Sequence, residues 1–466
     1  MPFVNRDPEL RFLLQRFESG RPELLVIYGR RRTGKTELLK RFCEERSHVF
    51  FVGNQTTAEE QLADFSQVLT ALPGSPLPEG ARLGNWRDAL KLLGDLARDR
   101  RFVAVFDEFP YLLASTPTLA SLLQNIWDHE LGGSGLMLIL CGSHVGVMES
   151  DVLGQGSPLY GRRTGQWRLR PLLFKDVAGF LPTYSLDDRA RSYGVVGGMP
   201  AYLGQFEASR PLDENVVIHI LSRGSFLYDE VQFLLVQELR DVSRYHAALS
   251  ALAAGATQQH EIARAMFGPG GGNPVQYLNR LRDLYLVERV VPATVKNPER
   301  TKTVIYRISD PFVRFWFRFA APNRSALEQG RGRDVWLQRI SPSLDDYMGP
   351  IFEEIGRQYA WSQAEMGDLP FVPDHIGPWW DGEEEIDVVA VRHDTREAWL
   401  AECTWSGHPL HPREHEELQR KAAYFQTKTG YVPRGLGLYA RGGFSDALRE
   451  RTQRHNLQLV SLADIA

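Results

Sequence analysis

Leu24-Leu25-Val26-Ile27-Tyr28-Gly29-Arg30-Arg31-Arg32-Thr33-Gly34-Lys35-Thr36 is the stretch from which the fold of this chain can be argued. Its first five residues are apolar without interruption, which predicts a strand buried on both faces of a sheet. The pattern over 35–46 predicts a helix. Between them lies the spacing Gly-x-x-x-x-Gly-Lys-Thr, which is typical of a phosphate-binding loop when a strand precedes it and a helix follows. A glycine turn that caps a structural helix is the alternative interpretation.

The loop predicts a set of contacts to a nucleotide. Glycines allow backbone N–H groups to wrap around phosphates, and the helix N-terminus adds partial positive charge. Lys35 would reach the β- and γ-phosphates, and the Thr36 hydroxyl would ligate Mg²⁺. The three arginines either face solvent or add positive potential over the phosphates. The expected ligand is ATP with Mg²⁺, and the expected binding residues are Gly29, Arg30, Arg31, Arg32, Thr33, Gly34, Lys35 and Thr36.

Polar residues follow two more apolar strands. The run 102–106 ends in Asp107 and Glu108, and the run 136–140 leads to Ser143. Ligands of parallel sheets bind at the carboxyl ends of the strands. We therefore expect Asp107 to hold the Mg²⁺ shell, Glu108 to orient or deprotonate the attacking water, and Ser143 to sense the γ-phosphate. The alternatives are an acidic pair that caps the next turn and a simple strand-to-helix turn at Ser143.

Arg162 and Arg163 follow Gly161 and are candidates for a catalytic cation. A guanidinium that reaches the γ-phosphate of its own or a neighbouring chain stabilises charge in the transition state of phosphoryl transfer. A solvated pair of arginines on a turn is the alternative.

The order of predicted elements indicates an α/β protein with several domains. A chain of 466 residues is too long for one compact core. Apolar strands alternate with helices as far as about residue 172, which predicts a parallel sheet covered on both faces. The middle is mostly helical, and the end is mixed. We expect a P-loop domain over 1–172, a helical subdomain over 173–240, a winged helix over 241–325 and a mixed α/β domain over 340–466. A linker is expected around 322–333.

Composition and charge limit the classes of protein to which this chain can belong. The chain has 43% hydrophobic and 24% charged residues and a net charge of −4, so the whole molecule is no nucleic-acid polycation. Residues 240–324 hold 13 lysines and arginines against 6 acidic residues, whereas 340–466 hold 12 against 21. The three cysteines are far apart and predict no disulfide framework. The sequence shows neither a membrane-spanning run nor a signal peptide, so a cytoplasmic location is expected.

The basic middle predicts a winged helix over 245–306. Helices are expected over 246–254, 258–266 and 273–286, followed by strands over 287–292 and 303–308 that flank a basic wing. Such a unit reads duplex DNA with its third helix and contacts phosphates with its wing. The alternative is a module that packs on the nucleotide domain or binds a protein. The candidate DNA contacts are Gln276, Asn279, Arg280, Arg282, Lys296, Arg300 and Lys302.

Taken together, these motifs resemble those of the archaeal-type ATPase family, a group of P-loop NTPases close to the AAA+ and STAND classes. The matching segments are 3–7, 29–36, 106–112, 142–143, 159–164 and 197–203. The resemblance implies ATP hydrolysis and places Asn5 and Arg6 near the adenine. It also identifies Gly198-Met199-Pro200 with the Gly-x-Pro element of the STAND helical region.

The acidic end resembles the domain that often accompanies this ATPase, which is thought to have a restriction-endonuclease-like fold of the PD-(D/E)xK type. The resemblance implies a second metal site built from Glu353 or Glu354, Asp387 and Glu402. Thr404 stands where the pattern expects lysine, so we expect DNA cleavage to be weak or absent unless Lys421 substitutes. Three histidines, His408, His411 and His415, lie near Cys403, but their spacing fits no zinc motif and favours a solvated loop.

Two functions from different classes remain open at this point. The first is an ATP-driven switch or motor on double-stranded DNA with a degenerate nuclease-like domain. The second is a STAND-like signalling ATPase whose winged helix and C-terminal domain bind protein partners. Either could form a homo-oligomer, and no membrane partner is expected. The charge carried by the third helix and the wing after folding discriminates between the two.

Overall fold

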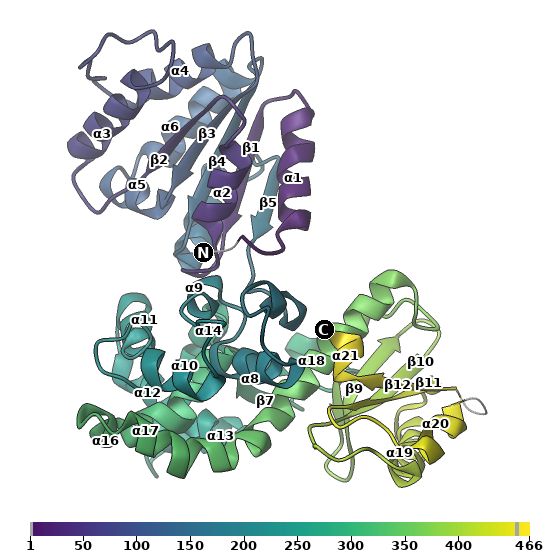
Figure 1. Cartoon of the computed structure of the whole chain (residues 1–466). Helices are drawn as coiled ribbons and strands as arrows, with labels where there is room; N and C mark the ends of the chain where they lie inside the picture. Colours follow the sequence, from purple (N-terminus) through teal and green to yellow (C-terminus); the bar gives the residue numbers. More distant parts are fainter. Residues whose placement is uncertain (1–2, 453–455) are drawn as a thin grey trace. The chain divides into compact units, whose positions relative to one another are not determined.

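The computed structural model describes residues 3–452 and 456–466, which form two compact units, Phe3–Pro171 and Leu172–Ala466 (Figure 1). The first is built on a five-stranded parallel sheet in the order β2-β3-β4-β1-β5. Its strands are β1 Glu23–Tyr28, β2 His48–Val52, β3 Phe102–Asp107, β4 Leu136–Gly142 and β5 Gly165–Arg168. The predicted parallel α/β fold of this part of the chain is confirmed.

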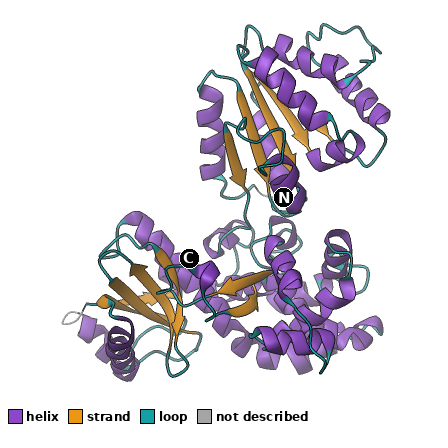
Figure 2. Ribbon diagram, turned by 180° about the vertical axis from the view of Figure 1, so that it is seen from behind, coloured by secondary structure: helices purple, strands orange, loops and turns teal. Residues whose placement is uncertain are grey.

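Helices cover both faces of this sheet (Figure 2). They are α1 Asp7–Glu18, α2 Lys35–Cys43, α3 Ala58–Thr70, α4 Trp86–Leu96, α5 Phe109–Ser115, α6 Leu119–Ile126, η1 Trp127–Leu131, α7 Val145–Val147 and η2 Met148–Val152. Successive side chains of β1 point to opposite faces of the sheet, so they pack against different helices. Leu24 and Val26 pack with α3, α4 and α6, whereas Leu25 and Ile27 pack with α1 and α2. The middle strands β1, β3 and β4 are therefore buried along their whole length, as a sheet covered on both faces requires.

The second unit begins with helices and a hairpin. Its first helices are η3 Phe174–Gly179, α8 Leu186–Val196, α9 Pro200–Leu203, α10 Leu212–His219 and α11 Glu230–Glu238. Then come α12 Val242–Ala253, α13 Gln259–Phe267, α14 Val275–Asp283, β6 Val287–Val290, η4 Pro298–Arg300 and β7 Ile305–Ile308. β6 and β7 pair antiparallel. Three helices followed by a hairpin is the order that the sequence predicted for 245–306.

The expectation of a linker around residues 322–333 is wrong, because this part of the chain is packed as helices. Residues 311–343 form α15 Pro311–Phe315, η5 Trp316–Ala320, η6 Ala321–Asn323, α16 Arg324–Glu328, α17 Gly332–Val335, η7 Trp336–Ile340 and η8 Ser341–Ser343. Trp316 and Trp336 are buried, and a Cβ added to Gly332 would lie 3.0 Å from the carbonyl oxygen of Leu221. Arg333 pairs with Asp213 at 2.5 Å. Tertiary burial of the tryptophans therefore holds a Pro- and Gly-containing segment as packed helices.

The C-terminal domain is a mixed sheet with helices. It comprises α18 Leu344–Met366, β8 His375–Trp380, β9 Glu385–Arg392, β10 Glu397–Thr404, α19 Pro412–Thr429, β11 Val432–Ala440, α20 Asp446–Thr452, β12 Leu457–Ser461 and α21 Leu462–Ile465. The strand order is β12-β11-β10-β9-β8, with β10, β11 and β12 parallel and β8 and β9 antiparallel. The Ala293 N–H after β6 donates to the carbonyl of Pro378 at 2.8 Å, so the hairpin is joined to this sheet.

Two observations bear on the expected environment. The cysteines Cys43, Cys141 and Cys403 are free thiols, in agreement with the absence of a disulfide framework. Within the described ranges, every helix is either too short or too polar to cross a membrane.

Candidate functional site

At two positions, the loop between β1 and α2 adopts a backbone conformation that favours glycine. Gly29 has a φ of 153°, and a Cβ there would lie 2.3 Å from the carbonyl oxygen of Leu169, just after β5. Gly34 is left-handed, with a φ of 90°, and precedes the first turn of α2. The loop can therefore turn tightly and present backbone N–H groups at the start of α2, which is the arrangement that binds phosphates.

Lys35 lies inside this loop. Its side chain is buried, and Nζ donates to the carbonyl oxygens of Gly29 at 2.8 Å and Arg30 at 2.9 Å. Burial lowers the pKa of Lys35, while Glu108 and Asp107 nearby favour its charged form. A buried ammonium held by neutral carbonyls is ready to exchange them for phosphate oxygens, because hydrogen bonds between two charged groups are stronger.

Thr36 and Asp107 meet across the edge of the sheet. The Thr36 hydroxyl donates to Oδ2 of Asp107 at 2.6 Å, and Asp107 is buried at the end of β3. A hydroxyl and a carboxylate in contact provide the oxygen ligands that Mg²⁺ prefers. These residues, 71 positions apart in the chain, therefore fit the predicted Mg²⁺ site.

Glu108 and Ser143 form the next pair along the same edge. Glu108 has a left-handed φ of 51°, and both of its carboxylate oxygens lie 2.7 Å from the Ser143 hydroxyl, which donates to them. Ser143 is buried after β4, so it holds the carboxylate beside Asp107. This contact supports a role for Glu108 in positioning water. The role of Ser143 as a sensor of the γ-phosphate stays a prediction.

The segment before α1 is attached to the loop. Arg6 is buried, donates to the carbonyl of Thr33 at 2.8 Å and pairs with Glu9 at 3.2 Å. Asn5 has a positive φ of 35° and directs the chain into this contact. The structure therefore places Asn5 and Arg6 next to the phosphate loop, and their contact with adenine stays a prediction.

Arg162 and Arg163 come just before the amino end of β5. Both precede β5, whereas Asp107 ends β3, and Lys35 and Ser143 follow the carboxyl ends of β1 and β4, which run parallel to β5. Arg162 pairs with Asp128 at 2.8 Å, and Arg163 donates to the carbonyl of Leu153 at 3.2 Å. Arg162 is thus held by Asp128, whereas Arg163 is electrostatically close to Tyr28, the last residue of β1. Contact of either arginine with the nucleotide of its own chain stays a prediction. A reach to the nucleotide of a neighbouring chain stays a prediction.

Sequence reasoning missed Arg168 and Tyr111. Arg168 ends β5 at the carboxyl edge, pairs with Glu149 at 3.0 Å and lies 5.5 Å over the ring of Tyr28. Tyr111, on α5, accepts a hydrogen bond from Arg31 at 2.5 Å. The signal for Arg168 was weak because β5 is an edge strand with only partial burial and no apolar run.

Comparison with known proteins agrees with this geometry. A family model described as an ATPase domain predominantly from Archaea matches residues 3–206. The uncharacterized protein MJECL04 of Methanocaldococcus jannaschii is 32% identical over 418 residues, which cover 90% of each chain. The chain belongs to the archaeal-type ATPase family. The resemblance argued from the motifs is confirmed, and the family match extends past the first unit into the helices that follow it.

Three further similarities are narrower. The uncharacterized ATP-binding protein MJ0423 of the same organism is 48% identical over 44 residues, which are 9% of this chain and 75% of that protein. The Walker-type ATPase PABY2304 of Pyrococcus abyssi has a TM-score of 0.52 at 22% identity, covering 68% of this chain and 96% of that one. This likeness shows the fold alone. A second family model, described as archaeal and bacterial proteins of unknown function, matches residues 316–419.

The expected DNA contacts of this ATPase-family chain divide into two groups. Arg280 donates to the carbonyl of Glu238 at 3.2 Å, and Arg282 contacts Asn279 at 3.2 Å and Glu299 at 3.4 Å. These two arginines are partly engaged within the protein. The exposed members of the set are Gln276, Asn279, Lys296, Arg300 and Lys302.

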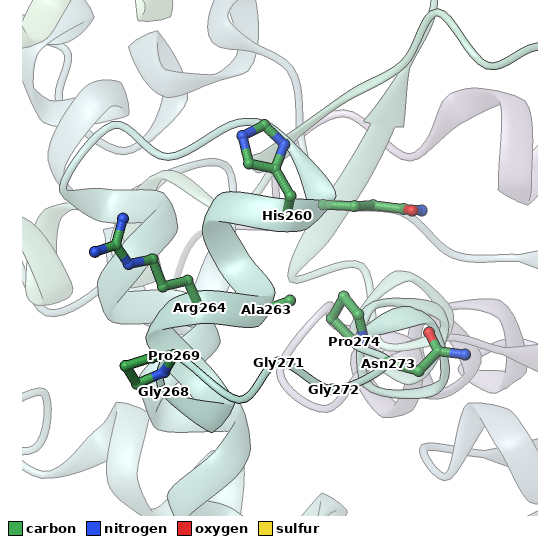
Figure 3. Close-up of a pocket in the computed structure, with 10 residues that line it drawn as sticks. His260, Ala263, Arg264, Gly268, Pro269, Gly271, Gly272, Asn273 and Pro274 are labelled. Atoms are coloured by element: carbon green, nitrogen blue, oxygen red, sulfur yellow. The ribbon is translucent and has the colours of Figure 1, made fainter.

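A groove of about 720 Å³ lies beside α14. Figure 3 shows His260 and Arg264 of α13 on one side of it and Asn273 and Pro274, which lead into α14, on the other. The glycine-rich turn between the two helices lines the remainder. The groove is open to solvent and adds one arginine to the exposed polar surface of this region.

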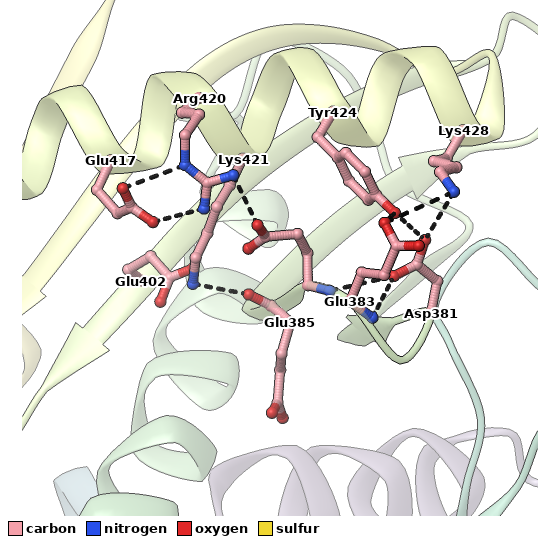
Figure 4. Close-up of polar contacts among 10 residues, drawn as sticks. Asp381, Glu383, Glu385, Glu402, Glu417, Arg420, Lys421, Tyr424 and Lys428 are labelled. Atoms are coloured by element: carbon pink, nitrogen blue, oxygen red, sulfur yellow. Dashed lines mark hydrogen bonds and ion pairs between the residues drawn. The ribbon is translucent and has the colours of Figure 1, made fainter.

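In the C-terminal domain, Asp387 and Glu402 lie side by side on β9 and β10. Oδ2 of Asp387 accepts the Cys403 N–H at 2.8 Å. Burial raises the pKa of Asp387 to about 8, with Glu402 and Glu353 adding to the effect. Lys421 of α19 donates to Oε1 of Glu402 and to the carbonyl of Glu385, both at 2.8 Å (Figure 4). Lys421 therefore lies beside Glu402, and its substitution for the lysine expected at position 404 stays a prediction.

The early-helix acids of the expected second metal site are engaged elsewhere. Glu353 lies 3.6 Å from Arg357 and 3.8 Å from Arg307, and Glu354 lies 3.0 Å from Arg357. Among residues 3–452 and 456–466, no group of three or more His, Cys, Asp and Glu side chains is arranged to hold a metal ion. The three predicted carboxylates thus approach one another without forming a ready cation site.

One histidine does not lie where the sequence suggested. His415 is buried on α19 and is 1% exposed, so the expectation of a solvated loop is wrong for it. His411 precedes the first turn of the same helix. The two prolines near these histidines suggested a loop, but Pro412 occupies the first turn of α19, where proline is well tolerated.

Proposed function

We propose that the chain binds ATP with Mg²⁺, hydrolyses it, and uses the cycle as a switch or motor on double-stranded DNA. One observation carries the first part of this proposal. Lys35, the Thr36–Asp107 pair and the Glu108–Ser143 pair meet at the carboxyl edge of one parallel sheet. Phosphoryl transfer requires a phosphate-binding cation, oxygen ligands for Mg²⁺ and a group that positions water, and all three are supplied here.

Each residue has a separate task in the proposed reaction. Lys35 moves its ammonium from the loop carbonyls to the β- and γ-phosphate oxygens. Mg²⁺, when bound by Thr36 and Asp107, neutralises charge on those oxygens. Glu108, held by Ser143, orients the attacking water and accepts its proton. The carboxylate needs this support because a 1 Å misplacement of a reacting group can lower the rate about 100-fold.

The DNA part rests on the exposed surface of the middle region. Gln276 and Asn279 are exposed on α14, where amide side chains can contact base edges. Lys296, Arg300 and Lys302 are exposed on the β6–β7 connection, where they can contact phosphates. A third helix and a basic wing used in this way make a winged helix that reads a duplex.

We infer further that the C-terminal domain is nuclease-like with weak or no cleavage. Thr404 offers no cation, and Glu353 is held by Arg357 and Arg307. Lys421 nevertheless contacts Glu402, which supports the hypothesis that Lys421 takes the role of the lysine expected at position 404. The test is cleavage of duplex DNA with Mg²⁺ and then Mn²⁺. Gain of cleavage in Thr404→Lys would mean a domain disarmed at one position, whereas cleavage by the wild type that Lys421→Ala abolishes would mean an intact enzyme.

The test of the whole proposal is duplex binding with and without ATP over a range of salt concentrations. A steep fall of the binding constant with salt, altered by ATP in the wild type but not in Lys35→Ala, is the expected result. Absence of duplex binding even at low salt contradicts the DNA part. Absence of ATP hydrolysis in a clean preparation contradicts the enzymatic part.

A second function, a STAND-like signalling ATPase that binds protein, is favoured by a different observation. On α11, Phe233 is 57% exposed and Val236 is 64% exposed, close to the helix end whose Glu238 carbonyl accepts from Arg280. Neighbouring apolar side chains on a surface often mark contacts with proteins. Double substitution of Phe233 and Val236 by serine would leave DNA binding unchanged and abolish partner binding or homo-oligomerisation if this function is correct.

The free thiols agree with a reducing compartment, so we place the protein in the cytoplasm.

A further inference from the structure

The second unit contains a cavity of about 130 Å³ in addition to the open groove beside α14. It lies where the β6–β7 hairpin meets α8, α15 and α18, and each of these elements supplies part of its lining. A water molecule takes up about 30 Å³ in the liquid, so the cavity has the size of about four waters. This space accommodates an ion of a few heavy atoms and is too small for a nucleotide.

Charged side chains from several elements line this cavity. The cations are Arg307 of β7, Arg314 of α15 and Arg357 of α18, and the carboxylates are Glu288 of β6 and Glu354 of α18. Among the described residues of the lining, cations therefore outnumber anions by one. Cations gathered around one recess repel one another unless an anion lies between them.

The charge of Arg357 is already compensated. Its Nε lies 3.0 Å from Glu354, a second nitrogen lies 3.6 Å from Glu353 behind the lining, and it donates to the carbonyl of Asp387 at 3.1 Å. Only 8% of the side chain is accessible. Arg357 therefore joins the walls of the cavity and has little capacity left for a ligand.

Arg307 is compensated less completely. One of its terminal nitrogens lies 3.8 Å from Glu353, and Nε lies 3.1 Å from Oε1 of Glu288. Nε is buried, yet it makes no hydrogen bond with any residue that the structure describes, because its N–H is not directed at that oxygen. A buried charged donor without an acceptor is unfavourable, and an anion in the cavity would supply the acceptor.

Arg314 has an aromatic ring rather than an acid as its neighbour. Its guanidinium lies 5.4 Å over the ring of Tyr347. In the described part of the chain it forms no ion pair with an aspartate or glutamate within 4.0 Å. A ring face attracts a cation but accepts none of its N–H groups in the way that an oxyanion does. Arg314 therefore supplies the excess positive charge of the lining.

Glu288 is suited to lie beside an anion. Its side chain is 43% accessible, yet burial raises its pKa, although the arginines of the lining oppose the shift. Accessible surface on a desolvated group faces a recess rather than open water. A carboxyl group with a raised pKa takes up a proton more readily than an ordinary glutamate, and in that form it donates a hydrogen bond. Glu288 can therefore face an oxyanion without repelling it.

We propose that this cavity binds a small oxyanion of the size of sulfate or phosphate, held by the guanidinium groups of Arg314 and Arg307. Each guanidinium presents a planar fork of donors that matches a pair of oxygen atoms. The bound ion joins α15 to the β6–β7 hairpin and fixes the hairpin against the helices around it. The site belongs to the second unit, and its existence depends neither on the proposed ATP hydrolysis nor on the proposed DNA binding.

Equilibrium dialysis of the full chain with labelled sulfate, and separately with labelled phosphate, measures this binding at an ionic strength held constant with chloride. Every protein in the experiment also carries Lys35→Ala, so that the phosphate loop does not take up the ion. We expect one ion per chain. Comparison of the two affinities then shows which ion the cavity prefers.

Substitutions of Arg314 test the residue that supplies the excess charge. We expect Arg314→Gln to weaken binding about 10-fold or more, because hydrogen bonds to charged groups are the strong ones. Arg314→Lys should weaken it less, since lysine keeps the charge but lacks the planar fork. Arg318→Gln is the matched control, because Arg318 is exposed on η5 and lies outside the lining.

Glu288→Gln tests the sign of the ligand charge. The amide removes a negative charge from the lining and keeps a donor, so the ion should bind at least as tightly as to the parent chain. Weaker binding of the ion in Glu288→Gln overturns the proposal, because a cavity for anions gains from the loss of a carboxylate.

Two further outcomes overturn the proposal. One is the absence of saturable sulfate and phosphate binding in the Lys35→Ala parent. The other is equal affinity in Arg314→Gln and Arg318→Gln. Circular dichroism and a thermal unfolding curve establish that each variant is folded. If Arg314→Gln does not fold, the affinities of Arg314→Lys and Glu288→Gln relative to the parent decide the question.

Discussion

Substitution of Gly29 by alanine tests whether the phosphate loop is held closed by the end of β5. A Cβ at Gly29 would lie 2.3 Å from the carbonyl oxygen of Leu169, a distance that real Cβ atoms do not show, and the obstacle is backbone. The φ of 153° is also one that alanine rarely adopts. The substitution therefore combines backbone strain with a collision that a side-chain rotation cannot relieve.

The magnitude can be estimated by comparison with Gly20. That residue has a φ of 66° and open space around its missing Cβ, so Gly20→Ala introduces backbone strain alone. We expect it to cost about 1–2 kcal/mol of unfolding free energy. Gly29→Ala adds a collision with backbone, and overpacking costs about 1–3 kcal/mol more, which gives about 2–5 kcal/mol in all.

Urea unfolding followed by circular dichroism measures both variants, and nucleotide binding is measured on the folded fractions. We expect Gly29→Ala to lose ATP affinity because relief of the collision moves the loop, and Gly20→Ala to keep it. Equal unfolding free energies for the two variants would refute the argument from the Leu169 contact. Unchanged ATP affinity in Gly29→Ala would refute the link between this contact and the phosphate site.

The other predictions concern catalysis, DNA and pH. Glu108→Gln should keep ATP bound and lower kcat at least 100-fold in a phosphate-release assay, because the amide cannot accept the proton of water; normal turnover would reverse its role with that of Asp107. Lys302→Ala should reduce the slope of log binding constant against log salt by about one, and Arg280→Ala by less, because the Glu238 carbonyl already engages Arg280; equal slopes for both and the wild type would remove the DNA interpretation. Since burial raises the pKa of Asp387 to about 8, the folded state binds a proton that the unfolded state releases above its own pKa of 3.8. The contribution of Asp387 to stability is thus fully present below pH 3.8 and is lost as the pH rises to about 8. The unfolding free energy of Asp387→Asn relative to that of the wild type should therefore increase by at most about 1.4 kcal/mol per pH unit between pH 5 and 8, and it should not increase further by pH 9. Unfolding curves recorded with a chelator measure this difference.

Local sequence determined the elements that carry the nucleotide site. The uninterrupted apolar strand before Gly29, the glycines around the loop and the helix from Lys35 onward are each set by neighbours in the chain, because conformational freedom and side-chain period are local properties. The acids at the end of β3 were visible for the same reason. A parallel sheet then follows from apolar strands that alternate with helices, and the structure has that sheet.

Only the tertiary structure decided which side chains meet. The strand order brings Ser143 to Glu108 and Asp107 to Thr36. Likewise, the contact of Arg31 with Tyr111 joins residues 80 positions apart, and Lys421 reaches Glu402 from another helix. Sequence spacing does not report such contacts, because they depend on the order of strands and on the packing of helices against the sheet. For the same reason a Pro- and Gly-containing segment around 322–333 became packed helices once buried tryptophans stabilised it.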